Sequence, residues 1–226
     1  MLLKGCGISK RYFRKTKKAN YFYAVQKTDI EIVPGNITVI TGRSGSGKST
    51  LLNMLAGLLE PPVGKVYFVD KAIYSMNDKE ISMLRNEKIG IIPQGQTGLA
   101  SLTVLENVML PYCMYKKKEN VDKYAEELLE TVGIKELANA YPSELSGGEN
   151  RRAAIARALI QNPDVVLADE PTGDLDDENT RAVLELLRKT ADNGKAIMLV
   201  THENEALAYA DKVYKMDAGV LSGEDT

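Results

Sequence analysis

Four short stretches of the chain are apolar almost throughout, as is typical of strands buried on both faces of a sheet. They occupy residues 36–41, 89–94, 165–168 and 196–200. After the first of them, leucine and methionine recur at helical spacing, at Leu51, Leu52, Met54, Leu55, Leu58 and Leu59. The combination of buried strands and amphipathic helices predicts an α/β core.

Three further stretches predict strands outside that core pattern, in residues 2–9, 28–33 and 65–69. Residues 28–33 alternate between polar and apolar side chains and end at the turn Pro34-Gly35, as expected of a strand with one buried face. Residues 77–87 are polar and predict a helix.

From residue 101 to residue 134 the composition shifts to helix formers, interrupted by Pro111 and by the lysine run 116–118. One helical face there is apolar and comprises Ala125, Leu128, Leu129 and Val132. We therefore expect a helical subdomain at about 95–150, inserted between strands of a single domain that spans 1–226. About 1–94 and 151–226 would form the rest of it, and the lysine run is interpreted as a solvated connection between helices.

Residues 42–50 match the pattern G-x-x-x-x-G-K-[ST] in full, between a predicted strand and a predicted helix, as a phosphate-binding loop requires. Glycines let backbone N–H groups surround an anion, and the helix dipole adds positive charge. Lys48 can reach the outer phosphates of a nucleotide, and the Ser49 hydroxyl can bind the magnesium ion that bridges them. The expected nucleotide contacts are Gly42, Ser44, Gly45, Ser46, Gly47, Lys48, Ser49 and Thr50.

A second helix start suited to an anion follows Leu145, where Ser146, Gly147 and Gly148 precede a predicted helix at about 150–159. The chain has one lysine-bearing phosphate loop, so we expect this second helix start to contact a nucleotide bound to another copy. The sequence therefore predicts a dimer with nucleotide sites at its interface.

Polar residues that follow the buried strands are candidates for catalysis. Asp169, beside the phosphate loop, can hold magnesium through water, and Glu170 can polarise the attacking water as a general base. Gln94 carries an amide that can bind magnesium or orient water. His202 is the only histidine of the chain, which excludes a metal site built from several histidines, and it is a candidate for contact with the γ-phosphate.

A basic and aromatic segment, residues 10–18 and 21–23, separates the first two predicted strands. This composition also occurs in nucleic-acid-binding patches. We prefer an arrangement in which one ring stacks on an adenine base and the lysines lie on a solvated loop. Tyr12 is the first choice for that ring and Tyr23 the second, and simple packing of Tyr12 at a strand end remains open.

Composition and charge limit the possible partners and the possible location of the protein. The chain has 226 residues, and its formal net charge of −2 gives no indication of a nucleic-acid partner. Cys6 and Cys113 lack CxxC or histidine neighbours, so we expect two buried free thiols in a reducing compartment. No apolar run approaches the roughly 20 residues that span a bilayer, and no signal peptide precedes the fold. We expect a location in the cytoplasm or at the membrane's cytoplasmic face.

Taken in order, six motifs resemble those of the ATP-binding subunit of ABC transporters. They are the phosphate loop, Gln94, residues 145–149, Asp169-Glu170, residues 173–176 and His202. The resemblance covers nearly the whole chain and implies a P-loop NTPase core with an antiparallel β subdomain and an inserted α-helical subdomain. It also implies ATP and Mg²⁺ as cofactors, and two copies that close head to tail around two ATP molecules.

Roles for individual residues follow from the same resemblance. Ser146, Gly147 and Gly148 would contact the ATP of the partner copy, and Asp176 would contact the partner across the interface. Gln94 would sense the γ-phosphate and couple to integral membrane permease subunits, and Tyr12 resembles the adenine-stacking aromatic. Opening after hydrolysis would switch the permease between inward and outward states, with this chain bound peripherally at the cytoplasmic face of the membrane.

A narrower resemblance is to the lipoprotein-release, macrolide-export and antimicrobial-peptide group, which moves lipoproteins, peptides or amphipathic antibiotics and includes cell-division relatives. It is carried by residues 45–53, Arg85-Asn86 ahead of 89–90, and residues 102–111. The chain departs from the group at 150–152, where glutamines before an arginine are commoner, and at Asp174, where asparagine or alanine is commoner. Both departures leave Ser146 and Glu170 intact, so ATP hydrolysis is still expected.

Three classes of function compete. An energy-coupling ATPase of a transporter is favoured, and a peptide-sensing or cell-division complex without true transport is its alternative. A soluble ATPase acting on DNA or ribosomes usually carries a long coiled-coil insertion or two tandem cassettes, which this chain lacks. A non-hydrolysing clamp is disfavoured because Glu170 and His202 are both present.

Overall fold

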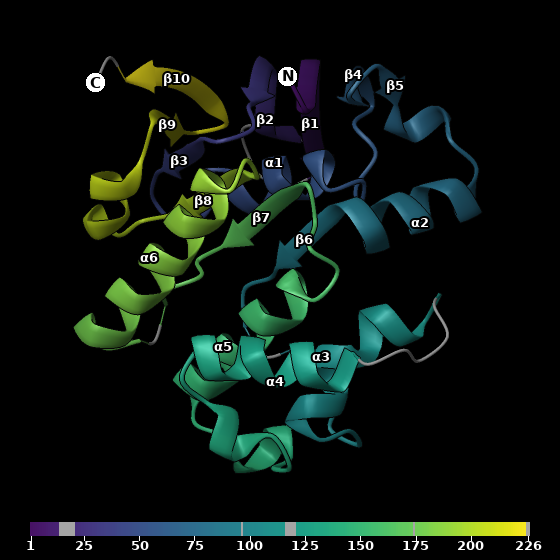
Figure 1. Ribbon diagram of the computed structural model, residues 1–226. Coiled ribbons are helices and arrows are strands. Elements are labelled where there is room, and N and C mark those ends of the chain that lie inside the picture. Colours follow the sequence, from purple (N-terminus) through teal and green to yellow (C-terminus); the bar gives the residue numbers. More distant parts are fainter. Residues whose placement is uncertain (14–20, 96, 116–120, 174, 225–226) are drawn as a thin grey trace.

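The computed structural model describes residues 1–13, 21–95, 97–115, 121–173 and 175–224 (Figure 1). The strands are β1 (Leu3–Phe13), β2 (Tyr21–Ile32), β3 (Ile37–Thr41), β4 (Val63–Phe68), β5 (Lys71–Ala72), β6 (Ile89–Ile92), β7 (Val165–Asp169), β8 (Ala196–Thr201), β9 (Lys212–Asp217) and β10 (Val220–Glu224). The helices are α1 (Lys48–Leu55), α2 (Asp78–Lys88), α3 (Val104–Cys113), α4 (Val121–Thr131), α5 (Gly147–Leu159) and α6 (Asp177–Asp192). Short 3-10 turns are η1 (Ile73–Ser75), η2 (Lys135–Leu137), η3 (Pro142–Glu144) and η4 (Asn204–Tyr209).

The strands form two sheets. The six-stranded sheet has the order β10-β9-β3-β8-β7-β6, in which β9, β3, β8, β7 and β6 run parallel and β10 pairs antiparallel with β9. The four-stranded sheet has the order β2-β1-β4-β5 and is antiparallel. The predicted α/β core is therefore present, together with an antiparallel β layer.

Helix α1 joins the two sheets and fixes the position of the phosphate loop. Its residues Leu51, Leu52 and Leu55 are almost fully buried, and the helix contacts β1 and β2 of one sheet and β7 and β8 of the other. A helix that is apolar on several sides is stable only inside a core. Because α1 is enclosed in this way, its N-terminal end is held beside the carboxyl ends of the parallel strands.

Helices α3, α4 and α5 lie together below the large sheet, and their residues come between β6 and β7 in the chain (Figure 1). Val108, Leu129 and Ile155, one from each helix, belong to a single buried cluster. We expected Pro111 to interrupt the helical region, but α3 runs through Pro111 and ends at Cys113. Pro111 lies near the helix end, where the missing N–H removes a single intrahelical hydrogen bond.

The described residues of the basic and aromatic segment, 10–13 and 21–23, lie in the paired strands of the β1–β2 hairpin, so the expectation of a loop was wrong for these residues. β1 continues to Phe13 and β2 begins at Tyr21, and the two strands pair Tyr12 with Phe22 and Phe13 with Tyr21. Cross-strand aromatic pairs of this kind stabilise an antiparallel ladder. Residues 14–20, the lysine run 116–118 and Asp174 lie outside the described residues.

Other expectations concern exposure. Cys6 and Cys113 are free thiols, but both are partly exposed, so the prediction that they are buried was wrong.

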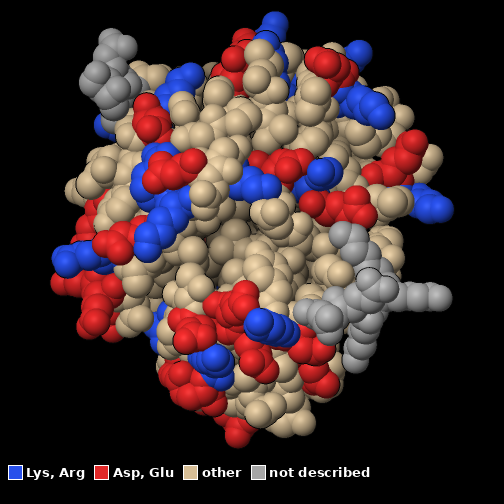
Figure 2. Space-filling model, viewed as in Figure 1, with Lys and Arg blue, Asp and Glu red and all other residues tan. Residues whose placement is uncertain are grey.

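None of the helices in the described ranges combines the length and the apolar character needed to cross a bilayer. On the face shown in Figure 2, lysine and arginine are interspersed with acidic residues above, and acidic side chains predominate over the lower, helical part.

Candidate functional site

A cavity of about 340 Å³ lies where β3, β6, β7 and β8 end, against the N-terminal end of α1. In open α/β sheets, ligands bind outside the carboxyl ends of parallel strands. The cavity is lined by Tyr12, Phe22, Ala24, Ser44, Gly45, Gly47, Lys48, Ser49, Thr50, Gln94, Asp169, Glu170 and His202. The structure thus brings together most of the residues that the sequence marked as candidates, although they come from distant parts of the chain.

The phosphate loop is tightly packed against its neighbours. Lys48 is buried, and its Nζ donates to the carbonyl oxygens of Gly42 at 2.7 Å and Arg43 at 3.3 Å. Gly47 has a φ of 112°, and a Cβ there would lie 1.8 Å from the carbonyl oxygen of Ala24. Only glycine satisfies both demands, so the loop can approach the backbone of β2 closely at this position.

Glu170 is held by three neighbours at the end of β7. Its Oε2 accepts hydrogen bonds from Thr201 Oγ1 at 3.0 Å and from His202 Nδ1 at 3.0 Å, and its Oε1 lies 3.9 Å from Lys48 Nζ. The hydrogen bond to Glu170 raises the pKa of His202 above its ordinary value. Glu170 also has a φ of 50°, a sparsely populated region for a non-glycine residue that recurs at functional sites.

Asp169 has the properties of a ligand for a hard divalent cation. Its Oδ1 is buried and has no hydrogen-bond partner among the described residues. Burial raises the pKa of its carboxyl group, while a hydrogen bond from Ser49 and the positive charge of Lys48 oppose that rise. A carboxylate oxygen with a free lone pair beside a hydroxyl group fits the oxygen coordination of Mg²⁺. Gln94 lies exposed on the lining of the same cavity.

The hairpin supplies the aromatic wall of the cavity. Tyr12 and Phe22 both line it, with ring centroids 5.9 Å apart and planes inclined by 32°. Tyr23 follows Phe22 in the strand, so its side chain points to the opposite face, and it is absent from the lining. Sequence reasoning missed Phe22 because it treated the segment as a loop, whereas the alternation of a strand identifies it.

Gly42 and Ser46 belong to the phosphate loop but do not line the cavity, and Ser146, Gly147, Gly148 and Asp176 lie outside the cavity of their own chain. Ser146 caps α5, where its Oγ accepts from the Glu149 N–H at 3.3 Å and the Glu149 carboxylate accepts from the Ser146 N–H at 2.7 Å. Asp176 caps α6 by accepting from the Asn179 N–H at 2.8 Å. Ser146, Gly147 and Asp176 are exposed, so they are accessible to another molecule.

Further polar contacts beside the site had no signal in the sequence. Thr201 is 1% exposed and donates to the carboxylate of Glu170. Thr172 donates to the carboxylate of Glu203, and the Glu203 N–H in turn donates to Thr201 Oγ1 at 3.1 Å. These contacts connect the end of β8 with the turn after the acid pair, and only the folded arrangement reveals them.

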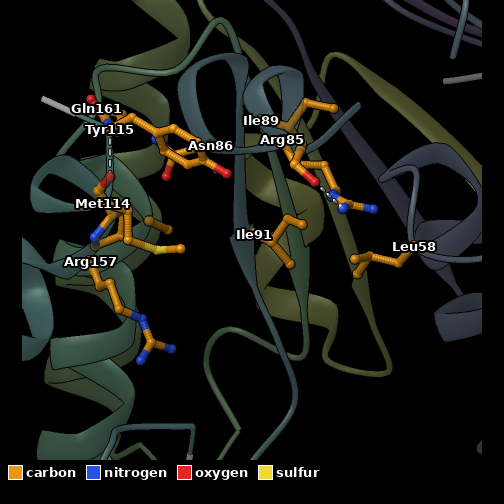
Figure 3. Close-up of a pocket in the computed structure, with 13 residues that line it drawn as sticks. Leu58, Arg85, Asn86, Ile89, Ile91, Met114, Tyr115, Arg157 and Gln161 are labelled. Carbon is orange, nitrogen blue, oxygen red and sulfur yellow. Dashed lines mark hydrogen bonds between the residues drawn. The ribbon is translucent and has the colours of Figure 1, made fainter. Parts of the chain in front are cut away.

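A second cavity, of about 360 Å³, lies between α2 and β6 on one side and α3 and α5 on the other (Figure 3). Its apolar lining includes Leu58, Ile89, Ile91 and Met114. Two arginines flank it. Arg85 donates to the Gly57 carbonyl oxygen at 2.7 Å, and Arg157 donates to the Thr97 carbonyl oxygen at 2.8 Å. We refer to this cavity as the α2–α3 groove.

A sequence model described as ABC transporter matches residues 25–173. The chain belongs to the ABC transporter family. This ABC protein is 39% identical over 224 residues to the lipoprotein-releasing system ATP-binding protein LolD of Saccharophagus degradans, covering 98% of this chain and 96% of that one. It is 42% identical over 199 residues to an uncharacterised ABC transporter ATP-binding protein of Methanocaldococcus jannaschii, covering 88% and 89% of the two chains.

The ABC protein also resembles solved structures along its whole length. A dimeric ATP-binding cassette in a post-hydrolysis state, bound to ADP and Pi, superimposes with a TM-score of 0.91 at 32% identity, covering 100% of both chains. These similarities confirm the predicted family, the predicted fold class and the expectation of an ATPase. The predicted likeness to the lipoprotein-release group is confirmed as well.

Proposed function

We propose that this ABC ATPase binds ATP with Mg²⁺ in the cavity around Lys48 and hydrolyses it as the energy-coupling subunit of a membrane transporter. The observation that carries the proposal is the convergence of the phosphate loop, Asp169, Glu170 and His202 on one cavity. A cationic loop and a nearby carboxylate are what phosphoryl transfer to water requires.

The contacts of Glu170 suit it for the role of general base. Thr201 and His202 hold Oε2, which leaves Oε1 directed toward Lys48. When phosphate oxygens of ATP bind Lys48 Nζ, Oε1 of Glu170 would become free to accept a proton from the attacking water. The water oxygen would bond to the γ-phosphorus, and the bond from the γ-phosphorus to the ADP oxygen would break. Asp169, Ser49 and Gln94 would hold Mg²⁺, which neutralises charge on the phosphates.

The same proposal includes a head-to-tail dimer. Ser146, Gly147 and Gly148 would bind the ATP of the partner copy, and Asp176 would contact that copy. Two observations support this arrangement. Ser146 lies on the exposed start of α5, outside the cavity of its own chain, and the similar solved cassette is dimeric. The helical region at about 95–150 would act as the subdomain that presents Ser146.

Membrane permease subunits are the proposed partners, and the α2–α3 groove is their proposed docking site. The groove is bordered by β6, which leads directly to Gln94, so an occupant can be coupled to the nucleotide site. Its apolar lining flanked by Arg85 and Arg157 suits a cytoplasmic segment with apolar residues and a carboxylate. The ATPase would then lie at the cytoplasmic face of the membrane.

The proposed cargo is a lipoprotein, a peptide or an amphipathic antibiotic, since LolD of S. degradans carries a lipoprotein-releasing function in its name and spans nearly the same length. The alternative is an ATPase of a peptide-sensing or cell-division complex without true transport. The similarity to LolD over nearly the whole chain favours transport of such a cargo.

Affinity purification of the tagged protein from native membranes tests the transporter assignment. We expect an integral membrane subunit with a large extracytoplasmic domain to co-purify, together with ATPase activity. Leu58→Glu in the α2–α3 groove should abolish co-purification and leave the ATPase activity of the isolated chain intact. Val63→Glu is the matched control, because Leu58 and Val63 are similarly exposed at 52% and 54% and Val63 lies outside the groove. Recovery of soluble partners alone would contradict the transporter assignment.

A further inference from the structure

Arg151 connects three parts of the structure that surround the candidate site. It lies near the start of α5 and is 6% exposed. Its Nη1 donates to the carbonyl oxygen of Pro93 at 2.7 Å, directly before Gln94. Its Nη2 lies 3.8 Å from the position that a Cβ on Gly173 would occupy. One side chain therefore bonds α5 to the segment after β6 and ends near the turn that follows the acid pair.

The environment of Arg151 is unusual for a buried positive charge. Its guanidinium bonds to a carbonyl oxygen, and within the described part of the chain it forms no ion pair. Burying a guanidinium without a carboxylate is costly, so packing alone does not account for an arginine at this place.

Arg151 also has no role in the function proposed above. Arg151 is the fifth residue of α5, and a polar side chain at this position does not need to cross into the core for helix stability. The reach of Arg151 therefore indicates a purpose other than forming α5.

We propose that Arg151 is a positioning residue for hydrolysis, which ties the backbone before Gln94 to α5 next to the turn after Glu170. The inference rests on the proposed function, because Gln94, Asp169 and Glu170 act together only if ATP is hydrolysed in this cavity. Arg151 holds the segments that carry these side chains at a fixed separation. It lies outside the phosphate cavity lining, so it acts through them.

This role predicts that a substitution of Arg151 changes kcat without changing the affinity for ATP. A displacement of about 1 Å at a reacting group can reduce a rate by about 100-fold. Ground-state binding of the phosphates depends instead on the loop and on Lys48, which Arg151 does not contact. Loss of Arg151 should therefore lower kcat while leaving the affinity for ATP nearly unchanged.

The test compares the full-length wild-type protein with Arg151→Met, with kcat and KM from ATPase assays and the Kd of ATP from calorimetry. We expect kcat to fall at least about tenfold, with KM and Kd changing less than about threefold. Arg151→Lys, which keeps the charge and one donor, should recover much of kcat. Arg188→Met is the structural control, since Arg188 bonds to Asp211 and Gly35 at the far end of the fold. It should lower the melting temperature without changing kcat of the folded protein.

A kcat of Arg151→Met within about twofold of wild type would overturn the proposal, and so would a rise in KM without loss of kcat. If Arg151→Met does not fold, Arg151→Ala serves instead, because alanine is the best helix former and its side chain does not reach Pro93. It should show the same loss of kcat, and a wild-type kcat would again overturn the proposal. Absence of ATPase activity in the wild-type protein would instead refute the proposed function, so the two failures are distinguishable.

Discussion

At the scale of single residues, the candidate site is built from charged groups that constrain each other. Lys48 is held by the carbonyl oxygens of Gly42 and Arg43, and Glu170 by Thr201 and His202. Such contacts reduce the freedom of both side chains and preorganise them for charge that develops during phosphoryl transfer. Two substitutions examine these contacts separately.

Lys48→Ala should remove most of the affinity for ATP. A charge-assisted hydrogen bond contributes about 1.5–3 kcal/mol, which corresponds to a loss of roughly 10- to 150-fold in Kd. Isothermal titration calorimetry measures the change directly. Arg43→Ala is the control, because Arg43 is exposed and absent from the cavity lining. Unchanged ATP binding by Lys48→Ala would refute the assignment of the phosphate loop.

The hydrogen bond between His202 and Glu170 should make stability depend on pH. Glu170 raises the pKa of His202 above 6.5, so the folded state is stabilised below that pH and the contribution disappears as pH rises through the raised pKa. Urea unfolding should show His202→Gln less stable than wild type at pH 6, by less than about 1 kcal/mol because the imidazole is exposed. The difference should vanish near pH 9, and a difference independent of pH would contradict this account.

At the scale of elements, Ser146 at the start of α5 would have two roles. Within the chain, Ser146 and Glu149 form a reciprocal capping box that satisfies the first N–H groups of the helix. In the proposed dimer, the same hydroxyl and the helix dipole face a phosphate of the partner's ATP. Substitutions of Ser146 should therefore change both stability and activity.

Ser146→Ala should lower the free energy of unfolding by about 1 kcal/mol. Ser146→Asp keeps an N-cap acceptor but replaces the hydroxyl that donates to the Glu149 carboxylate with a second carboxylate, so it should also lower the free energy of unfolding. Both variants should lose most ATPase activity, and the aspartate variant more, because its carboxylate would repel the phosphates. Chemical denaturation and steady-state ATPase assays give the two readings. An active Ser146→Asp variant would contradict the proposed role of α5.

The elements around the phosphate loop could be predicted because continuous apolar runs and helical leucine spacing leave few alternatives for residues 36–59. The hairpin was missed because residues 10–13 are two basic residues followed by two aromatic ones, so they lack the polar and apolar alternation of a half-buried strand. Thr201, Phe22 and Arg151 were missed for a different reason. Their partners lie far away in the sequence, so only the tertiary arrangement of strand ends defines their contacts.

At the scale of the whole molecule, one chain contains only half of the machinery proposed here. The cavity holds the phosphate loop and the acids, while Ser146, Gly147 and Asp176 lie exposed elsewhere. ATP itself, bound between the phosphate loop of one copy and α5 of the other, would supply the main specific contacts.

The most direct test of this account is the mass of Glu170→Gln in solution, measured by light scattering after gel filtration with ATP and Mg²⁺. The substitution removes the base and keeps the ground-state contacts, so ATP should accumulate between two copies. The account predicts a dimer with ATP and Mg²⁺, a monomer with ADP, and a monomer under both conditions when Ser146→Asp is added. A Glu170→Gln protein that stays monomeric with ATP and Mg²⁺ would contradict it.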